Sequence, residues 1–432
     1  MNELFLAQGA SSRLACADCG ADWPADSAAI ECESGGHLLD VVHAEPSRRG
    51  AALIDHFASR RADVTTPANR SGVWRFRELV MPGADAPVTW PEGNTPLVER
   101  DRVAEYAGVE HLTIKHEGMN PTGSFKDRGM TVAVTAAVRA RASAVACAST
   151  GNTAASLAAY AAQAGIPALV FVPRGNVAAG KLAQATAYGA RTLIVNGDFD
   201  GCLQLARSAS RELGVYLANS VNPWRIEGQK TIVWELLEQL DWKAPDWIAL
   251  PAGALGNTSA FGKALREARA LGLIDAMPRL LGVQAAGAAP FAQGFVRDFA
   301  KRVTVRAETV ATAIRIGDPA SWDRAVRAIR ETAGVVTMVT DGEILEAKAV
   351  VDASGLGCEP ASAAGIAGVR ALVERGVIAR DARVACVLTG HVLKDPESVS
   401  TFHAGDSGRA NPPIAIEPTL ADVTRILEML AP

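Results

Sequence analysis

Residues 143–172 read SAVACASTGNTAASLAAYAAQAGIPALVFV, and this stretch decides the fold. Its two ends, Ser143–Ala148 and Ala168–Val172, are apolar at successive positions, which is typical of strands buried on both faces. The alanine-rich run Thr153–Ala164 between them has the length and composition of a helix. A strand, a helix and a second strand in this order predict parallel strands covered by helices.

The same alternation continues along the rest of the chain. Further strands are predicted at Thr192–Val195, Val215–Ala218, Trp247–Leu250, Arg279–Val283 and Arg383–Leu388, and further helices at Gly201–Leu213, Gly228–Leu240, Thr258–Leu271 and Ala361–Glu374. We therefore expect an α/β protein with two domains built on parallel or mostly parallel sheets, and a cleft between them. The expected division is a smaller domain of residues 126–218 and a larger domain of residues 46–125 with 219–432. Ligands in such folds bind beyond the carboxyl ends of the strands.

The composition narrows the class of protein. The chain has 432 residues, 49% of them hydrophobic, with a net charge of −4 and a pI near 6.0. This balance disfavours a nucleic-acid or anionic-membrane surface, and no apolar run reaches the length of a membrane span. Seven cysteines in a long chain without an evident signal peptide favour a reducing compartment over a disulfide framework. We expect a cytoplasmic protein that binds neither nucleic acid nor membrane.

The N-terminal segment, residues 1–45, has the pattern of an incomplete zinc ribbon. Cys16 and Cys19 form a CxxC knuckle and Cys32 begins a second one, but Gly35 occupies the place of the fourth thiolate. His37 could substitute for that thiolate only if the turn were rebuilt. The sequence therefore predicts a ribbon-like segment without metal, and zinc bound by the three cysteines is the alternative.

One lysine stands on a turn that could aim it into a cleft. Residues 120–130 read NPTGSFKDRGM, so Lys126 follows a turn punctuated by Pro121 and Gly123 and precedes the apolar run Thr131–Val138. A lysine amine whose pKa is lowered by burial or by a neighbouring cation can form a Schiff base. The segment alone would serve equally well as an exposed helix start.

Three polar turns, each directly after a predicted strand, favour anion binding. Ser149–Thr153 places hydroxyls, an amide and free N–H groups at a helix N-terminus, where ordinary capping would use only one of them. Pro251–Thr258 is rich in glycine, so its backbone can approach a phosphate closely, although it matches neither a Walker A loop nor a dinucleotide fingerprint. Asn219–Arg225 collects amide, hydroxyl and guanidinium donors. Together they predict a phosphorylated cofactor and an anionic substrate.

With these motifs the chain resembles the threonine synthase family of pyridoxal-phosphate-dependent enzymes, which share the tryptophan-synthase-β-type fold, also called fold type II. The resemblance extends from about Ser71 to Asp395. Its carriers are Glu92–Leu97, Asn120–Met130, Ser149–Thr153, Asn219–Thr231, Gly253–Thr258, Ala313–Gly317, Glu359–Ala364 and Thr389–Pro396.

The resemblance implies a role for each candidate residue. Lys126 would carry pyridoxal 5'-phosphate and act as the mobile acid–base, Asn152 would hydrogen-bond the ring hydroxyl, and Thr389 would face the ring nitrogen. The loop that would cradle the cofactor phosphate consists of Gly253, Ala254, Leu255, Gly256, Asn257 and Thr258. The residues that would hold the carboxylate and phosphate of the substrate are Ser149, Thr150, Thr153, Asn219, Ser220 and Arg225.

The activity that the resemblance implies is the conversion of O-phospho-L-homoserine and water to L-threonine and phosphate, by γ-elimination and β-addition of water. The smaller domain would close over the substrate, the larger would bind the cofactor, and a homodimer is expected. One alternative is an O-phosphoserine-dependent cysteate or cysteine synthase of the same fold. A threonine or serine dehydratase would have no evident need for Arg225, and a non-catalytic binding protein would have no need for the lysine and the anion turns together.

Overall fold

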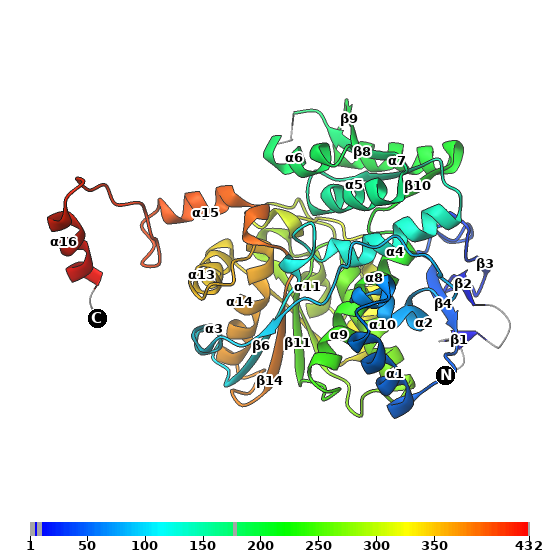
Figure 1. Cartoon of the computed structure of the whole chain (residues 1–432), viewed down its shortest axis with the longest axis horizontal. Helices are drawn as coiled ribbons and strands as arrows, with labels where there is room; N and C mark the ends of the chain where they lie inside the picture. The colour runs from blue at the N-terminus through cyan, green and yellow to red at the C-terminus, as the bar shows by residue number, and fades with distance from the viewer. Residues whose placement is uncertain (1–4, 7–10, 176–178, 431–432) are drawn as a thin grey trace.

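The computed structural model describes residues 5–6, 11–175 and 179–430 and arranges them around three sheets (Figure 1). The largest sheet has the order β13-β12-β11-β14-β6-β5. Its strands are β13 (Val335–Val339), β12 (Arg279–Ala285), β11 (Trp247–Pro251), β14 (Arg383–Leu388), β6 (His111–His116) and β5 (Leu97–Val98). All pairs are parallel except β5 with β6, which is antiparallel. The predicted mostly parallel α/β fold is confirmed.

Helices cover both faces of this sheet, as its strands require because they are apolar on both sides. One face is covered by α3 (Asp101–Ala107), α13 (Asp341–Ala353) and α14 (Pro360–Glu374). The other carries α9 (Thr231–Gln239), α10 (Gly256–Ala270) and α12 (Trp322–Glu331), while α11 (Pro290–Val296) packs beside β12 and β13. Each face has its own apolar core.

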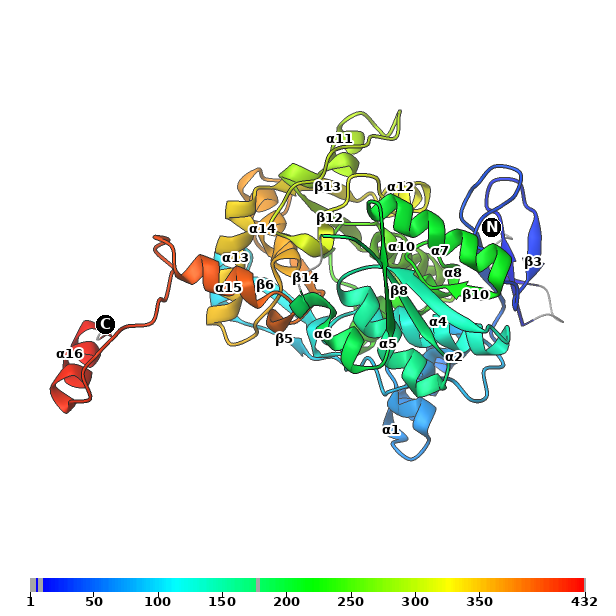
Figure 2. The ribbon, with the colours of Figure 1, turned by 90° about the horizontal axis from the view of Figure 1, so that it is seen from above.

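A second, fully parallel sheet has the order β10-β7-β8-β9 and lies beside the first (Figures 1 and 2). Its strands are β7 (Ala144–Ala148), β8 (Ala168–Pro173), β9 (Arg191–Val195) and β10 (Val215–Leu217). The helices around it are α4 (Lys126–Arg139), α5 (Asn152–Ala164), α6 (Ala179–Ala187) and α7 (Phe199–Leu213). The sheet lies between α5 and α7, and α4 packs on α5.

The N-terminal ribbon forms a small sheet of order β1-β4-β2-β3 at one end of the molecule. Its strands are β1 (Phe5–Leu6), β2 (Ser12–Ala15), β3 (Asp22–Pro24) and β4 (Asp40–Ala44). The remaining helices are α1 (Gly50–Ala62), α2 (Arg77–Val80), α8 (Pro223–Gln229), α15 (Pro396–His403) and α16 (Leu420–Leu430). Short 3-10 turns lie at Pro67–Arg70, Trp74–Phe76, Glu117–Met119, Ala286–Ala288, Thr312–Ile314 and Val392–Lys394.

The crossing of α4 and α8 brings the two sheets' loops together. A side chain at Gly228 would overlap the Arg128 carbonyl, and one at Gly129 would lie 3.0 Å from the Arg225 carbonyl oxygen, so only glycine allows the two backbones to approach this closely. Asn222 caps α8 by accepting hydrogen bonds from the N–H groups of Trp224 and Arg225 at 3.0 and 3.3 Å. The crossing therefore places the first turn of α8 against the first turn of α4.

No helix among the described residues is both long enough and apolar enough to cross a lipid bilayer.

Candidate active site

The turn before Lys126 is held from both sides. Thr122 donates from its N–H and its hydroxyl to the Asp127 carboxylate, at 2.7 and 2.6 Å, and this closes the turn on the first residues of α4. The Phe125 N–H donates to the Thr389 carbonyl at 2.9 Å, which ties the turn to the end of β14. Lys126 therefore begins α4, which belongs to the second sheet, and its turn is anchored to the end of β14 in the largest sheet.

The Lys126 amine is partly buried and lies 4.1 Å from the centre of the Phe125 ring. Among the described residues it has no hydrogen bond or ion pair. Burial, then the positive charge of Arg225, lower the pKa of Lys126 to about 7, against a smaller opposing effect of Glu359. A large fraction of the amine is therefore neutral at pH 7, which is the form that attacks carbonyl groups and accepts protons.

Arg225 is a buried cation without an acidic partner in the described chain. Its side chain is 1% exposed, and its only hydrogen bond there runs from Nη1 to the Ala218 carbonyl, at 3.2 Å. Its Nε and Nη2 groups have no acceptor among the described residues. Burial lowers the pKa of Arg225 to about 10, so it remains charged at pH 7. A buried, charged guanidinium with free N–H groups is a site for a phosphate or carboxylate.

The glycine-rich loop between β11 and α10 forms a second anion cradle. Leu255 has a φ of 66°, and a side chain at Gly253 would come within 3.1 Å of the Ile314 Cα atom. Within the described chain, the loop N–H groups from Gly253 to Leu255 have no acceptor, and the Thr258 hydroxyl and Asn257 Oδ1 are buried without partners. Free N–H groups at the start of a long helix fit a phosphate.

The Thr389 hydroxyl is oriented by a serine whose role sequence reasoning missed. Ser362 Oγ accepts hydrogen bonds from the N–H groups of Thr389 and Gly390, each at 2.9 Å, and lies 3.0 Å from Thr389 Oγ1. Because both lone pairs of Ser362 Oγ are used, its own proton is donated to Thr389 Oγ1 or to the Gly390 carbonyl at 3.4 Å, and the Thr389 proton is free to be donated. The only signal for Ser362 was its place in the segment Glu359–Ala364.

Asn152 contacts Glu359, a second residue to which the sequence assigned no role. The Asn152 amide donates to both Glu359 oxygens, at 3.2 and 3.0 Å, which joins the start of α5 to the start of α14. Burial raises the pKa of Glu359, with Asn152 and the nearby lysines acting against that shift. The Asn152 Oδ1 atom has no donor among the described residues and is available to accept a hydrogen bond from a ligand.

The predicted substrate residues follow β7 and β10, which are neighbours in the second sheet, β10-β7-β8-β9. Ser149, Thr150 and Thr153 are partly buried around the start of α5, and Ser149 accepts a hydrogen bond from Gly151 at 3.2 Å. Asn219 exchanges two hydrogen bonds with the Ala148 backbone, at 2.9 and 3.0 Å, so its amide mainly ties β10 to β7. Ser220 is partly buried beside it.

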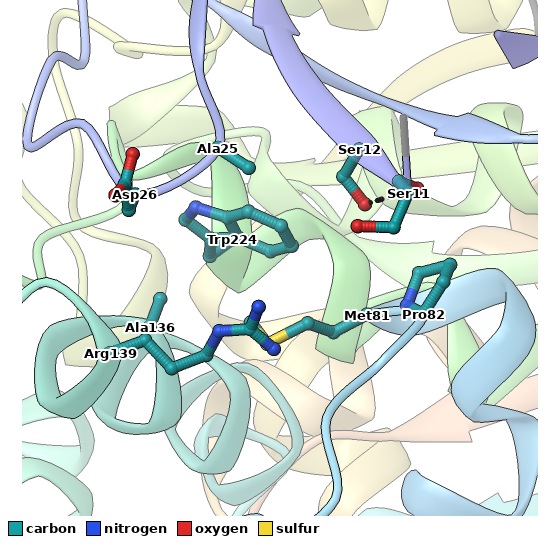
Figure 3. Close-up of a pocket in the computed structure, with 9 residues that line it drawn as sticks. All are labelled: Ser11, Ser12, Ala25, Asp26, Met81, Pro82, Ala136, Arg139 and Trp224. Atoms are coloured by element: carbon teal, nitrogen blue, oxygen red, sulfur yellow. Dashed lines mark hydrogen bonds between the residues drawn. The ribbon is translucent and has the colours of Figure 1, made fainter. Parts of the chain in front are cut away.

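A small cavity of about 140 Å³ lies where the ribbon meets α2, α4 and α8 (Figure 3). Figure 3 shows the Trp224 ring between Ala25 of the ribbon and the Arg139 guanidinium of α4. No residue predicted to bind the cofactor or substrate lines this cavity. It is therefore a gap in the packing of the ribbon, separate from the site around Lys126.

The chain matches the family described as "Pyridoxal-phosphate dependent enzyme" over residues 88–390. A threonine synthase of Methanosarcina acetivorans is 47% identical over 390 residues, 89% of this chain and 93% of the relative. The chain belongs to the threonine synthase family. A second family member, the threonine synthase of Methanocaldococcus jannaschii, is 42% identical over 96% of this chain and 99% of its own length. The structure of maize serine racemase matches with a TM-score of 0.62 at 25% identity, covering 71% of this chain and 91% of the racemase.

Membership of this family makes the chain a pyridoxal-phosphate-dependent lyase and confirms the resemblance and fold type II. The residues present fit the cofactor. The free N–H groups and orphaned hydroxyl after β11 suit its phosphate, the Thr389 donor suits an unprotonated ring nitrogen, and the nearly neutral Lys126 amine suits its aldehyde.

Proposed function

We propose that this enzyme converts O-phospho-L-homoserine and water to L-threonine and inorganic phosphate. The observation that carries the proposal is the buried guanidinium of Arg225, which has no acidic partner in the described chain and lies close enough to Lys126 to lower its pKa. A phosphate on the substrate would supply the missing negative charge. The names of the most similar relatives support the same reaction.

The cofactor would be held by Lys126, Asn152, Thr389 and the loop from Gly253 to Thr258. When bound, pyridoxal phosphate supplies an electron sink for the negative charge that develops at substrate carbon. The neutral Thr389 hydroxyl would donate its proton to the ring nitrogen, because Ser362 Oγ already accepts from two N–H groups and leaves that proton free. A neutral donor leaves that nitrogen unprotonated, whereas a carboxylate would stabilise its protonated form.

Lys126 would move protons at its Nζ atom. With a pKa of about 7, the amine can take the Cα proton from the substrate and later return a proton during product formation. Arg225 would hold the phosphate, and its charge would favour the phosphate's departure from Cγ if the free Nε and Nη2 groups face the leaving oxygens. Ser149, Thr150 and Thr153 would orient the carboxylate at the start of α5.

We also propose that residues 126–218 form a domain that closes over the substrate against residues 46–125 and 219–432, and that the enzyme works as a cytoplasmic homodimer. Closure would exclude water that could divert the reactive intermediate. Asn152 and Glu359, which already link the two sheets, would lie at the closing edge. Light scattering coupled to gel filtration tests the dimer, which a mass of one chain would contradict.

The test of the reaction is to incubate the holoenzyme with O-phosphohomoserine and to measure threonine and phosphate together. Equal amounts of both products are expected, and Lys126→Ala should lower the rate by about 10³-fold or more. O-phosphoserine with sulfide or sulfite is the matched control for the alternative synthases. Phosphate released with 2-oxobutyrate in place of threonine would contradict the proposal and indicate a phospholyase.

A further inference from the structure

The three cysteines of the ribbon come together in space. The Sγ atoms of Cys16, Cys19 and Cys32 all lie within 4.8 Å of one another, and those of Cys19 and Cys32 are 3.4 Å apart. All three thiols are free. In a tetrahedral zinc site with Zn–S distances of about 2.3 Å, sulfur atoms lie about 4 Å apart. The spacing of these thiols is therefore that of a metal site rather than of separate core residues.

The ring of His37 lies beside the position that the sequence left without a ligand. A Cβ atom built on Gly35 would lie 2.7 Å from Cδ2 and 3.1 Å from Nε2 of the His37 ring. The ring can lie there only because Gly35 has no side chain. The turn is closed by the Cys32 N–H, which donates to the His37 carbonyl at 2.8 Å. An imidazole therefore lies beside the position expected for a fourth cysteine, with its nitrogens outside the 4.8 Å cluster of the three sulfur atoms.

The surroundings of His37 suit a metal ligand. Its Nε2 is 3.5 Å from Asp18, inside the CxxC knuckle, and its Nδ1 is 4.0 Å from Asp323 of α12. Histidine ligands of zinc commonly donate their second ring nitrogen to a carboxylate, which fixes the ring's orientation. A turn of the ring toward the thiols would leave a carboxylate for the outer nitrogen.

We propose that Cys16, Cys19, Cys32 and His37 bind one zinc ion that stabilises the ribbon. The metal-free prediction rested on Gly35, whereas three thiols already converge and an imidazole that a turn of its ring would bring toward them lies beside Gly35. Three thiolates with one imidazole are a common ligand set of structural zinc sites, and a bound metal contributes directly to the folding free energy of a small sheet with little core of its own.

The ribbon in turn supports the helix that carries Arg225. His43 of β4 lies 2.6 Å from the Glu227 carboxylate of α8, and the Val41 carbonyl accepts from Lys263 of α10. These contacts are buried. Loss of the metal should therefore loosen the C-terminal half of α8 as well as the ribbon.

The test measures metal in the full-length holoenzyme, expressed without a polyhistidine tag in zinc-supplemented medium. Elemental analysis should find about one zinc per chain, and cobalt substitution should give thiolate-to-cobalt absorption with tetrahedral ligand-field bands. Cys19→Ala and Cys32→Ala should lose the metal, whereas Cys386→Ala should keep it, because Cys386 is buried in a core that includes no ribbon residue. Cys19 is exposed, so its variant should fold even if Cys32→Ala does not. His37→Ala should weaken zinc binding about 10-fold or more and change the cobalt spectrum.

Three results would overturn the site: no zinc and no thiolate-to-cobalt absorption, zinc that persists unchanged in Cys19→Ala, or a Cys19–Cys32 disulfide found by mass spectrometry in the native protein. An unchanged cobalt spectrum in His37→Ala would overturn the assignment of the fourth ligand. None of these measurements depends on turnover, so the zinc site is tested independently of the proposed reaction.

Discussion

At the scale of single residues, the protonation of Lys126 decides whether the site can work at neutral pH. Burial and the Arg225 charge lower its pKa to about 7, so the neutral amine should predominate above that pH. In cofactor-free protein, we expect acetylation of Lys126, followed by peptide mass spectrometry, to rise through a midpoint near pH 7. Exposed Lys301 in the same digest is the reference for the reagent. Arg225→Gln should move the midpoint upward, and equal labelling of the two lysines at pH 7 would contradict the assignment.

Arg225 is expected to lower the stability of the fold while it serves the reaction. Its buried charge has no acidic partner in the described chain, so replacement by an apolar side chain of similar length removes a desolvation cost. We expect Arg225→Met to raise the free energy of unfolding in urea by about 1–3 kcal/mol in phosphate-free buffer. The same change should lower kcat/KM for phosphohomoserine by about 10-fold to 100-fold, because charged hydrogen bonds to the phosphate are lost.

The matched control for this pair of measurements is Arg297→Met, since Arg297 is exposed. It should change neither quantity appreciably. With the cofactor bound in the cradle of Gly253–Thr258, added inorganic phosphate should stabilise the wild type but not Arg225→Met, because only the wild type retains the Arg225 anion site. A loss of stability in Arg225→Met without phosphate would show that the guanidinium has a compensating partner.

At the scale of elements, α8 is held by a buried cluster of charges centred on Glu227. Burial alone would raise the pKa of Glu227, but Lys230 and Lys263 lower it well below its usual range. A lowered carboxyl pKa adds stability above the unfolded pKa of about 4, and that stability is lost as the pH falls below it. We expect Glu227→Gln to cost about 3–5 kcal/mol at pH 7, because two buried lysines would then share the single carboxylate of Glu267.

The difference between Glu227→Gln and the wild type should narrow as the pH falls below about 4, where the carboxylate of the unfolded wild-type chain gains a proton while the folded one stays ionised. Urea denaturation at several pH values measures this. Glu212→Gln, at an exposed position, is the control and should follow the wild type throughout. A difference that stays constant down to pH 3 would mean that packing, rather than charge, explains the loss.

At the scale of the whole molecule, local sequence patterns predicted most of the apolar strands, although not β13, and few of the polar contacts. The predicted strand Arg383–Leu388 coincides with β14, whereas β6 was missed because it contains buried Lys115. Lys115 is paired with Glu235 at 2.5 Å, a partner 120 positions away that no local pattern shows. The helix predicted at Gly228–Leu240 is divided into α8 and α9, where the Thr231 hydroxyl donates back to the Gly228 carbonyl.

The candidate site was predictable only where its residues form a local sequence pattern. Polar turns that directly follow predicted strands are visible in the sequence, so Lys126 and Arg225 could be named from it. The contacts that orient Thr389 and Asn152 could not be predicted. Thr389 is aligned by Ser362 and Asn152 by Glu359, and both partners lie at the start of α14, far from them in the sequence. The assignments of individual site residues stay predictions.

The last element of the described chain, α16, stands away from the body in both views (Figures 1 and 2). Its Leu420 and Leu427 side chains are exposed, and the hydrogen bonds recorded for residues 412–430 stay within that segment. We therefore expect a chain that ends at Asn411 to unfold within about 2 °C of the full chain by calorimetry, with kcat/KM within about twofold. Asn411 is kept because its N–H donates to His403 at 3.0 Å. A clear fall in the unfolding temperature would show that the apolar face of α16 is covered in solution, since only buried apolar surface contributes to stability.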